Sequence, residues 1–95
     1  MSSPVHPEVL HEAAKQRYIY QSGEAVGVLD YELEATRMIF THTFVPEEFR
    51  GQGIAEKLVR AGLAHARQQQ LTVDPQCSYV AKFIARHDEF QDLLA

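Results

Sequence analysis

One short run of the sequence combines the residue types that suit binding of a phosphorylated ligand. It reads Phe-Arg-Gly-Gln-Gly-Ile-Ala and spans residues 49–55. Gly51 and Gly53 have no side chain, so the backbone there can approach a ligand closely. The first turn of the helix predicted to follow offers unpaired N–H groups and the positive end of the helix dipole. With the permanent charge of Arg50 beside them, these features predict an anion cradle for a phosphate or diphosphate.

The spacing of the glycines excludes two common nucleotide-binding motifs. No Gly-Lys-Ser/Thr follows, so the run is not a Walker loop. Glu56 stands where the dinucleotide fingerprint needs its third Gly or Ala. Two glycines between a strand and a helix are also typical of a simple connecting turn, and glycine spacing alone leaves both interpretations open.

The segment before the cradle is predicted to form strands. Short strands are expected over residues 17–20 and 25–33, joined by a turn that contains Gly23. Residues 36–45 are rich in β-branched and aromatic types and predict the strongest strand, which the following proline ends. Regular alternation places one set of its side chains together on one face: Met38, Phe40, His42 and Phe44. Both faces of this strand are expected to be buried, as in a central strand.

Beyond the cradle the periodicity changes to that of helices. Residues 53–69 contain no proline and carry a broad apolar face, which predicts a helix of about four to five turns. A short strand is expected over residues 71–73 and a second helix over residues 78–87. This order of elements predicts an α+β domain in which two helices cover a small sheet.

Length and composition limit the class of protein. Ninety-five residues with 45% hydrophobic residues fit one globular domain, expected over residues 9–95 after a loose arm at residues 1–8. A formal net charge of −4 argues against non-specific nucleic-acid binding, and no apolar run is long enough for a membrane helix. The single cysteine cannot form an internal disulfide or a cysteine-based zinc site. We therefore expect no metal and a reducing, cytoplasmic compartment.

The cradle and the C-terminal segment resemble a known family. Arg50-x-x-Gly53-x-Ala55 matches the Arg/Gln-x-x-Gly-x-Gly/Ala signature of the GNAT acyltransferase superfamily. Residues 41–67, THTFVPEEFRGQGIAEKLVRAGLAHAR, resemble the strand, loop and helix that hold the acetyl-CoA diphosphate in that superfamily. Residues 75–90, PQCSYVAKFIARHDEF, resemble the C-terminal signature of its short, single-domain branch. The resemblance covers residues 9–94, and on it the chain is identified as a GNAT-like N-acetyltransferase.

This resemblance implies a twisted, mainly antiparallel sheet with acetyl-CoA lying across a splayed pair of strands. The pantetheine would run beside Phe44, Val45 and the proline that follows them. The diphosphate would sit on the N–H groups of the cradle: Arg50, Gly51, Gln52, Gly53, Ile54 and Ala55. The thioester would point toward His42 and the start of the last helix.

Acetyl transfer to an amine needs a base and a proton donor for the departing thiolate, and three residues are candidates. The imidazole of His42 suits a base, although a histidine on a buried strand is also typical of a hydrogen-bonded core residue. Cys77 is expected at the first turn of the last helix, where it could accept the acetyl group, line the thioester pocket or pack in the core. Tyr79 lies near the position of a tyrosine general acid in many GNAT enzymes, but it could equally be structural.

The basic residues after the cradle also allow two interpretations. Lys57 or Arg60 could contact the adenosine 3′-phosphate of CoA, or they could belong to a solvated face with partners such as Glu56. Arg86 is interpreted as surface charge and His87 as a packing residue.

The chain departs from full-size GNAT enzymes at its N-terminal side. Those enzymes have N-terminal helices that wall the acceptor site, and this chain has no room for them, so we expect a truncated fold with an open acceptor site. An open site suits a bulky acceptor such as an amine on a protein. The predicted function is acetyl-CoA-dependent N-acetylation, and the alternative is a non-enzymatic acyl-CoA-binding or protein-interaction module.

Overall fold

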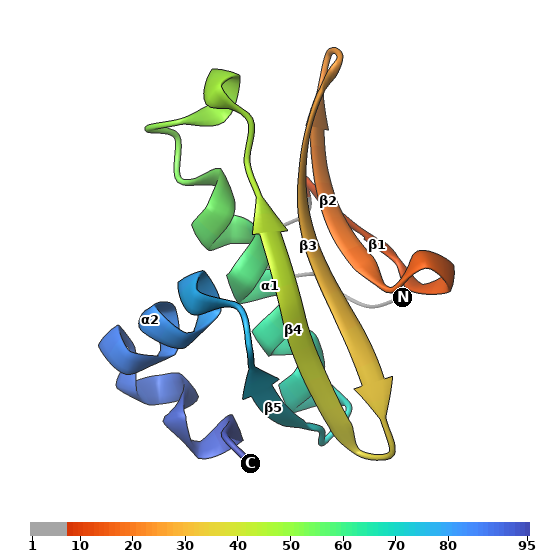
Figure 1. Cartoon of the computed structure of the whole chain (residues 1–95), viewed down its shortest axis with the longest axis vertical. Coiled ribbons are helices and arrows are strands. Elements are labelled where there is room, and N and C mark those ends of the chain that lie inside the picture. The colour runs from red at the N-terminus through yellow and green to blue at the C-terminus, as the bar shows by residue number, and fades with distance from the viewer. Residues whose placement is uncertain (1–7) are drawn as a thin grey trace.

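A five-stranded sheet in sequential order forms the framework of the protein, as the computed structural model in Figure 1 shows. Its strands are β1 (Val9–Glu12), β2 (Arg17–Ser22), β3 (Ala25–Glu34), β4 (Arg37–Phe44) and β5 (Thr72–Pro75). Strands β1 to β4 pair antiparallel, and β5 pairs parallel with β4 after the chain has crossed over through a helix. The structure describes residues 8–95, so the predicted arm lies outside the described residues except for Glu8.

Two α-helices complete the domain, and the predicted α+β class is confirmed. They are α1 (Ile54–Gln68), which crosses from β4 to β5, and α2 (Ser78–Arg86), which follows β5. A 3₁₀ helix over Asp88–Leu93 ends the chain beside α2. The sequence did not separate β1 from the general strand-like region, because its four residues alternate weakly. Within residues 8–95, no helix has both the length and the apolar character that a membrane span requires.

The core lies between α1 and one face of the sheet. The buried side of α1 carries Ile54, Leu58, Val59, Gly62, Leu63 and Ala66. It packs on Leu29, Met38 and Phe40, none of which is exposed to solvent. The approach is close at Gly62, where an added Cβ would lie 2.9 Å from the ring of Phe40. The helix therefore sits on the sheet at a distance that a larger residue at this position would not allow.

Two histidine–tyrosine pairs link the first strands to other elements: one joins β2 to α1 and the other joins β1 to β3. The hydroxyl of Tyr18 and Nδ1 of His65 are 2.6 Å apart, and Nε2 of His11 is 2.6 Å from the hydroxyl of Tyr31. The ring of His11 also stacks on that of Tyr18, with centroids 4.3 Å apart. Burial lowers the pKa of His65, and burial together with the neighbouring His65 lowers the pKa of His11. Both rings are therefore held preferentially in the neutral form.

A β-bulge in β4 changes which side chains face the core. Asp30 pairs with His42 and Tyr31 with Phe40, so Thr41 is an extra residue with no register partner on β3, although its hydroxyl donates to the Asp30 carbonyl. Thr43 pairs with Leu29 and therefore shares the α1-facing side with Phe40. The predicted single row of Met38, Phe40, His42 and Phe44 is wrong for this reason: the last two lie on the opposite face. The expected burial of both faces is also wrong at this end, since Phe44 is 52% exposed.

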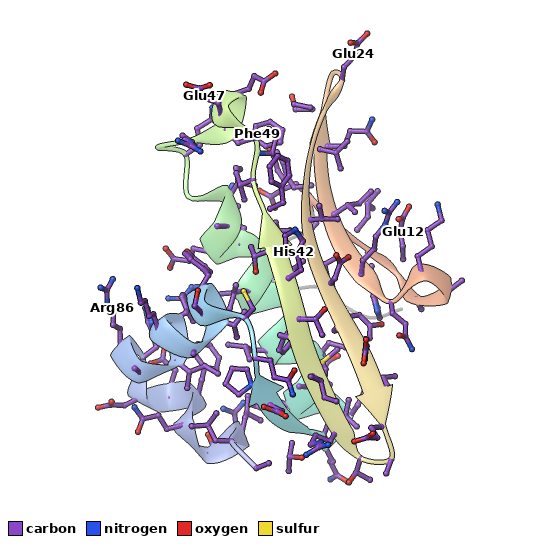
Figure 2. The ribbon with its side chains drawn as sticks, viewed as in Figure 1. Glu12, Glu24, His42, Glu47, Phe49 and Arg86 are labelled. Carbon is purple, nitrogen blue, oxygen red and sulfur yellow. The ribbon has the colours of Figure 1, made fainter. Side chains whose placement is uncertain are left out.

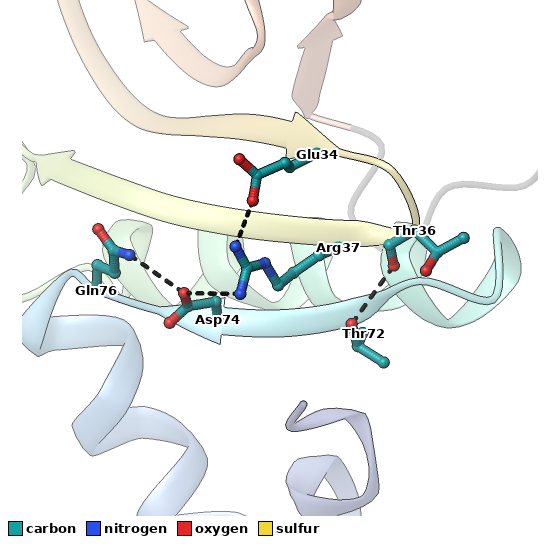
Figure 3. Close-up of polar contacts among 6 residues, drawn as sticks. All are labelled: Glu34, Thr36, Arg37, Thr72, Asp74 and Gln76. Atoms are coloured by element: carbon teal, nitrogen blue, oxygen red, sulfur yellow. Dashed lines mark hydrogen bonds and ion pairs between the residues drawn. The ribbon is translucent and has the colours of Figure 1, made fainter.

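Strands β4 and β5 are paired over only part of their length. Their register runs from Arg37–Thr72 to Phe40–Pro75, and beyond Phe40 the strand β4 continues with β3 as its one neighbour. Figure 3 shows polar contacts at the paired end, where Arg37 bonds Glu34 and lies 3.9 Å from Asp74, and Thr72 donates to the Thr36 carbonyl. The two strands separate above these contacts, and the chain turns away from β4 into α2 (Figure 1).

Candidate functional site

A buried aromatic ring fixes the loop between β4 and α1. The loop passes through a 3₁₀ turn, Glu47–Phe49, after which Arg50 returns to extended backbone. Phe49 is only 5% exposed, and its ring meets that of Tyr20 edge to face with centroids 5.2 Å apart. Figure 2 shows Phe49 turned inward while Glu47 points outward. This anchor holds the start of the cradle against the sheet while the residues after it are exposed.

Both cradle glycines have a backbone conformation that other residues rarely adopt. Gly51 has φ +79° and Gly53, the N-cap of α1, has φ +73°. A Cβ added at either position would meet no atom within 4 Å, so it would point into open space. The glycines therefore serve two purposes, because they allow the left-handed turns and leave the space in front of the helix clear.

The amide groups of the cradle divide into bonded and unbonded ones. The N–H groups of Arg50 and Gln52 donate to the carbonyls of Glu47 and Phe49. Helical bonding of α1 begins at Lys57, whose N–H donates to the Gly53 carbonyl. No atom of the described residues accepts from the remaining N–H groups, which are those of Gly51, Gly53, Ile54, Ala55 and Glu56. Of the amides predicted to bind a ligand, those of Arg50 and Gln52 are therefore already bonded. The N–H group of Glu56, which was not among them, is available.

These free amides border a hollow of about 280 Å³. Of the predicted cofactor-binding residues, the structure brings six to its lining: Val45, Arg50, Gly51, Gly53, Ile54 and Ala55. Phe44 and Gln52 are not part of it, since Phe44 faces the other side of the sheet and the Gln52 side chain donates to the Glu48 carbonyl. The Arg50 side chain has no ion-pair partner among residues 8–95, which leaves its charge available to a ligand. An uncompensated cation beside aligned N–H groups can bind a diphosphate.

Cys77 lies beside the separated strands. It is the N-cap of α2, its N–H donates to the Phe40 carbonyl over 2.9 Å, and its Sγ is 3.1 Å from Oγ1 of Thr43. The thiol is half-buried and packs against the core. Sequence reasoning missed Thr43 because its contact with Cys77 depends on the bulge, for which the sequence carries no clear signal.

The other two predicted catalytic residues lie in different surroundings. Tyr79 lines the hollow together with Glu56, and burial raises its pKa, with the Glu56 charge as a smaller cause. His42 lies across from Asp30 on the opposite face of the sheet from α1, and its side chain is exposed (Figure 2). The structure thus places Cys77 and Tyr79 on the helix-covered side and His42 on the other. In the described part of the chain, no group of three or more potential metal ligands gathers.

The fold thus brings free N–H groups and a hollow to the start of a crossover helix, beside two diverging parallel strands. Residues 16–93 match a family model described as GCN5-related N-acetyl-transferase. Because this match covers most of the sequence, the chain belongs to the GCN5-related N-acetyltransferase (GNAT) family.

Individual relatives agree with this assignment. Protein NATD1 of Bos taurus is 38% identical over 58 residues, and Protein NATD1 of Homo sapiens is 36% identical over the same length. These matches cover 60% of this chain and 51% of each relative, so the matched part spans about half of the curated proteins. A GCN5-like protein from Staphylococcus aureus, solved by NMR, superposes with a TM-score of 0.76 over 96% of this chain and 90% of its own, at 24% identity. That likeness establishes a shared fold.

Proposed function

We propose that this domain binds acetyl-CoA, with its diphosphate in the cradle, and transfers the acetyl group to an amine acceptor on a protein. The observation that carries the proposal is the row of N–H groups at residues 51 and 53–56, which have no acceptor among residues 8–95, beside Arg50, whose side chain has no ion-pair partner there. A helix N-terminus that presents several amides and a cation to one hollow favours a doubly charged group over a neutral one.

The residues present fit such a carrier along its length. The open edge of β4 beyond Phe40 offers backbone groups to an amide-containing chain, in the way that an extended peptide adds to a sheet edge. This edge leads from the cradle to Cys77 and Thr43, which are 3.1 Å apart at their sulfur and oxygen atoms. The bound carrier would supply an activated acyl group as its thioester.

The side chains near this edge have distinct chemical capacities. The phenol of Tyr79, whose pKa is raised by burial, is protonated at neutral pH and borders the diphosphate hollow, where it can donate a hydrogen bond to the carrier. The thiol of Cys77 can line the acyl site or take the acyl group. In the second case a new bond forms at Sγ, the bond to the carrier sulfur breaks, and the thiol proton passes to that sulfur. His42 can reach an acceptor only from the opposite face of the sheet, so a base role for it remains a separate proposal.

An acceptor borne on a protein is supported by exposed apolar residues on that opposite face. Leu10 is 56% exposed and Phe44 52%, and the register places both on this face through their pairings with Ile19 and Val28. A surface of this kind suits contact with a macromolecule better than enclosure of a small amine.

Calorimetric titration tests the binding step. We expect CoA and acetyl-CoA to bind and pantetheine, which lacks the diphosphate and the nucleotide, to bind far more weakly. If neither CoA nor acetyl-CoA binds at millimolar concentration, the proposal is wrong. Release of free thiol from acetyl-CoA in the presence of an amine peptide, measured against the same peptide with its amines blocked, then tests the transfer step. Tight binding without any thiol release would favour the non-enzymatic module.

A further inference from the structure

The hollow at the cradle continues into a second one along α2. This second hollow, of about 210 Å³, lies between α1 and α2, and Glu56 and Tyr79 line both. Its other walls come from α2 and the residue that follows it: Lys82, Phe83, Arg86 and His87. Tyr79, Lys82 and Arg86 recur at helical spacing, so they form a stripe along one side of α2. We call the second hollow the α2 groove.

The cations of the α2 groove differ from most other cations of the domain. Lys57 is paired with Glu8, and Arg60 with Glu56, each over 2.9 Å, and Arg60 also lies over the ring of Phe83. Arg17, Arg37 and Arg67 have carboxylate partners as well. In contrast, the side chains of Lys82 and Arg86 have no hydrogen-bond or ion-pair partner among residues 8–95, and both are exposed. Figure 2 shows Arg86 projecting outward from α2.

The charge of the α2 groove is therefore positive. Its one lining carboxylate, Glu56, is held by Nε of Arg60, and the Arg60 guanidinium also lies 3.9 Å from Glu89. The chain as a whole carries a formal net charge of −4, so the local charge of these two uncompensated cations is opposite in sign to the net charge of the molecule. A ligand that fills this groove gains most if it carries an anionic group of its own.

The position of the groove beside the diphosphate hollow indicates which anionic group of a ligand would lie there. Along the axis of α2, Lys82 lies about 4.5 Å and Arg86 about 10.5 Å beyond Tyr79, which borders the diphosphate hollow. A nucleotide whose diphosphate sits in the cradle would place its ribose in the shared part of the two hollows. CoA carries a phosphate monoester on that ribose in addition to the diphosphate, whereas dephospho-CoA does not.

We propose that Lys82 and Arg86 bind the ribose 3′-phosphate of CoA, so that the α2 groove distinguishes CoA from dephospho-CoA. This inference rests on the proposed function, since it needs the diphosphate to occupy the cradle. It transfers the role considered for Lys57 and Arg60 to residues of α2, because those two side chains are already paired with carboxylates. Contacts of this kind at an exposed site correspond to a preference for CoA of about tenfold.

Titration of the full chain with CoA and with dephospho-CoA tests the inference. We expect the wild type to bind CoA about tenfold more tightly. The double variant Lys82→Gln with Arg86→Gln should bind both ligands with the affinity that the wild type shows for dephospho-CoA. Lys15→Gln is the matched control, since Lys15 is an exposed cation of the turn between β1 and β2 that has no ion-pair partner in the described chain. All substituted side chains are exposed, and circular dichroism confirms the fold of each variant.

The outcomes distinguish a failure of this inference from a failure of the proposed function on which it rests. Equal affinity of the wild type for the two ligands would overturn the inference and leave the proposed function intact. A preference for CoA that survives in the double variant, or that Lys15→Gln weakens as much, would overturn the assignment to α2. Failure of both ligands to bind would overturn the proposed function, and the inference with it.

Discussion

Replacing Gly53 by alanine should separate the folding role of the cradle from its binding role. At φ +73° an alanine is strained in the folded state, and this strain costs about 1 kcal/mol or slightly more of the free energy of unfolding. For a domain of this size, 1 kcal/mol lowers the melting temperature by about 4–8 °C. Gly23, in the β2–β3 turn, offers a matched control. Its φ is +62°, and a Cβ there would also meet nothing within 4 Å.

The two variants should differ sharply in ligand binding. Gly53 lines the hollow and a Cβ there would enter open space, so we expect the Cβ of Gly53→Ala to hold a diphosphate away from the free amides. Loss of one hydrogen bond to a charged group is worth about 1.5–3 kcal/mol, which corresponds to at least about a tenfold loss of affinity for CoA. Gly23→Ala lies in the β2–β3 turn, outside the lining of the hollow, so its affinity should stay within about twofold of the wild type.

Thermal melts and calorimetric titration with CoA measure both effects on the same samples. We expect similar falls in melting temperature for the two variants and a loss of affinity for Gly53→Ala alone. If Gly53→Ala binds CoA as the wild type does, the diphosphate does not lie against these amides. If Gly23→Ala loses as much affinity, the loss reflects general destabilisation instead of local obstruction.

Three further predictions follow from the packing and the titratable groups. Gly62→Ala should lower the free energy of unfolding by about 1–2 kcal/mol in denaturant titration, because its Cβ would lie 2.9 Å from the buried Phe40 ring. This loss outweighs the helix preference of alanine over glycine, which is about 1 kcal/mol. A stabilised variant would contradict this packing. The free energy of unfolding should be full above about pH 6.5 and fall as the pH drops below it, because the lowered pKa values of His11 and His65 mean that unfolding takes up protons. Substitution of both residues by Gln should flatten the dependence of the melting temperature on pH. An unchanged slope would refute their role. Cys77→Ala should keep the affinity for CoA within about twofold of the wild type, since Cys77 lies outside the hollow. It should also remove any acetyl adduct that mass spectrometry detects on the wild type. An adduct that persists would exclude this thiol as the acceptor.

Local signals in the sequence were enough to predict the glycine turn before α1 and the main elements. Gly51 and Gly53 bear positive φ angles at the helix start, and such a turn depends on the residues of the turn itself. The strand at Thr36–Val45 and both helices were also recognisable, because their periodicity and composition are local properties. The burial of Ile54 and Leu58 follows from the same helical spacing.

Features that depend on pairing between distant segments could not be predicted. The bulge at Thr41 arises where β4 meets β3, and it reverses the faces of His42 and Phe44 without any mark in the sequence. The surroundings of the basic side chains could not be predicted in full either. Arg60 and its partner Glu56 are four residues apart and predictable as a pair, but only the packing of α2 beside α1 shows that Lys82 lines one groove with Glu56.

Phe40 links the packing of the core to the opening of the site. Its ring is fully buried against the face of α1 at Gly62, so its position is fixed by close packing. Its carbonyl accepts the N–H of Cys77, and it is the last residue of β4 that pairs with β5. The residue after it is Thr41, the extra residue of the bulge. The point at which the two strands separate is thus set by the same residue that closes the core, and this explains how a domain of 95 residues can hold an open strand edge without losing its packing.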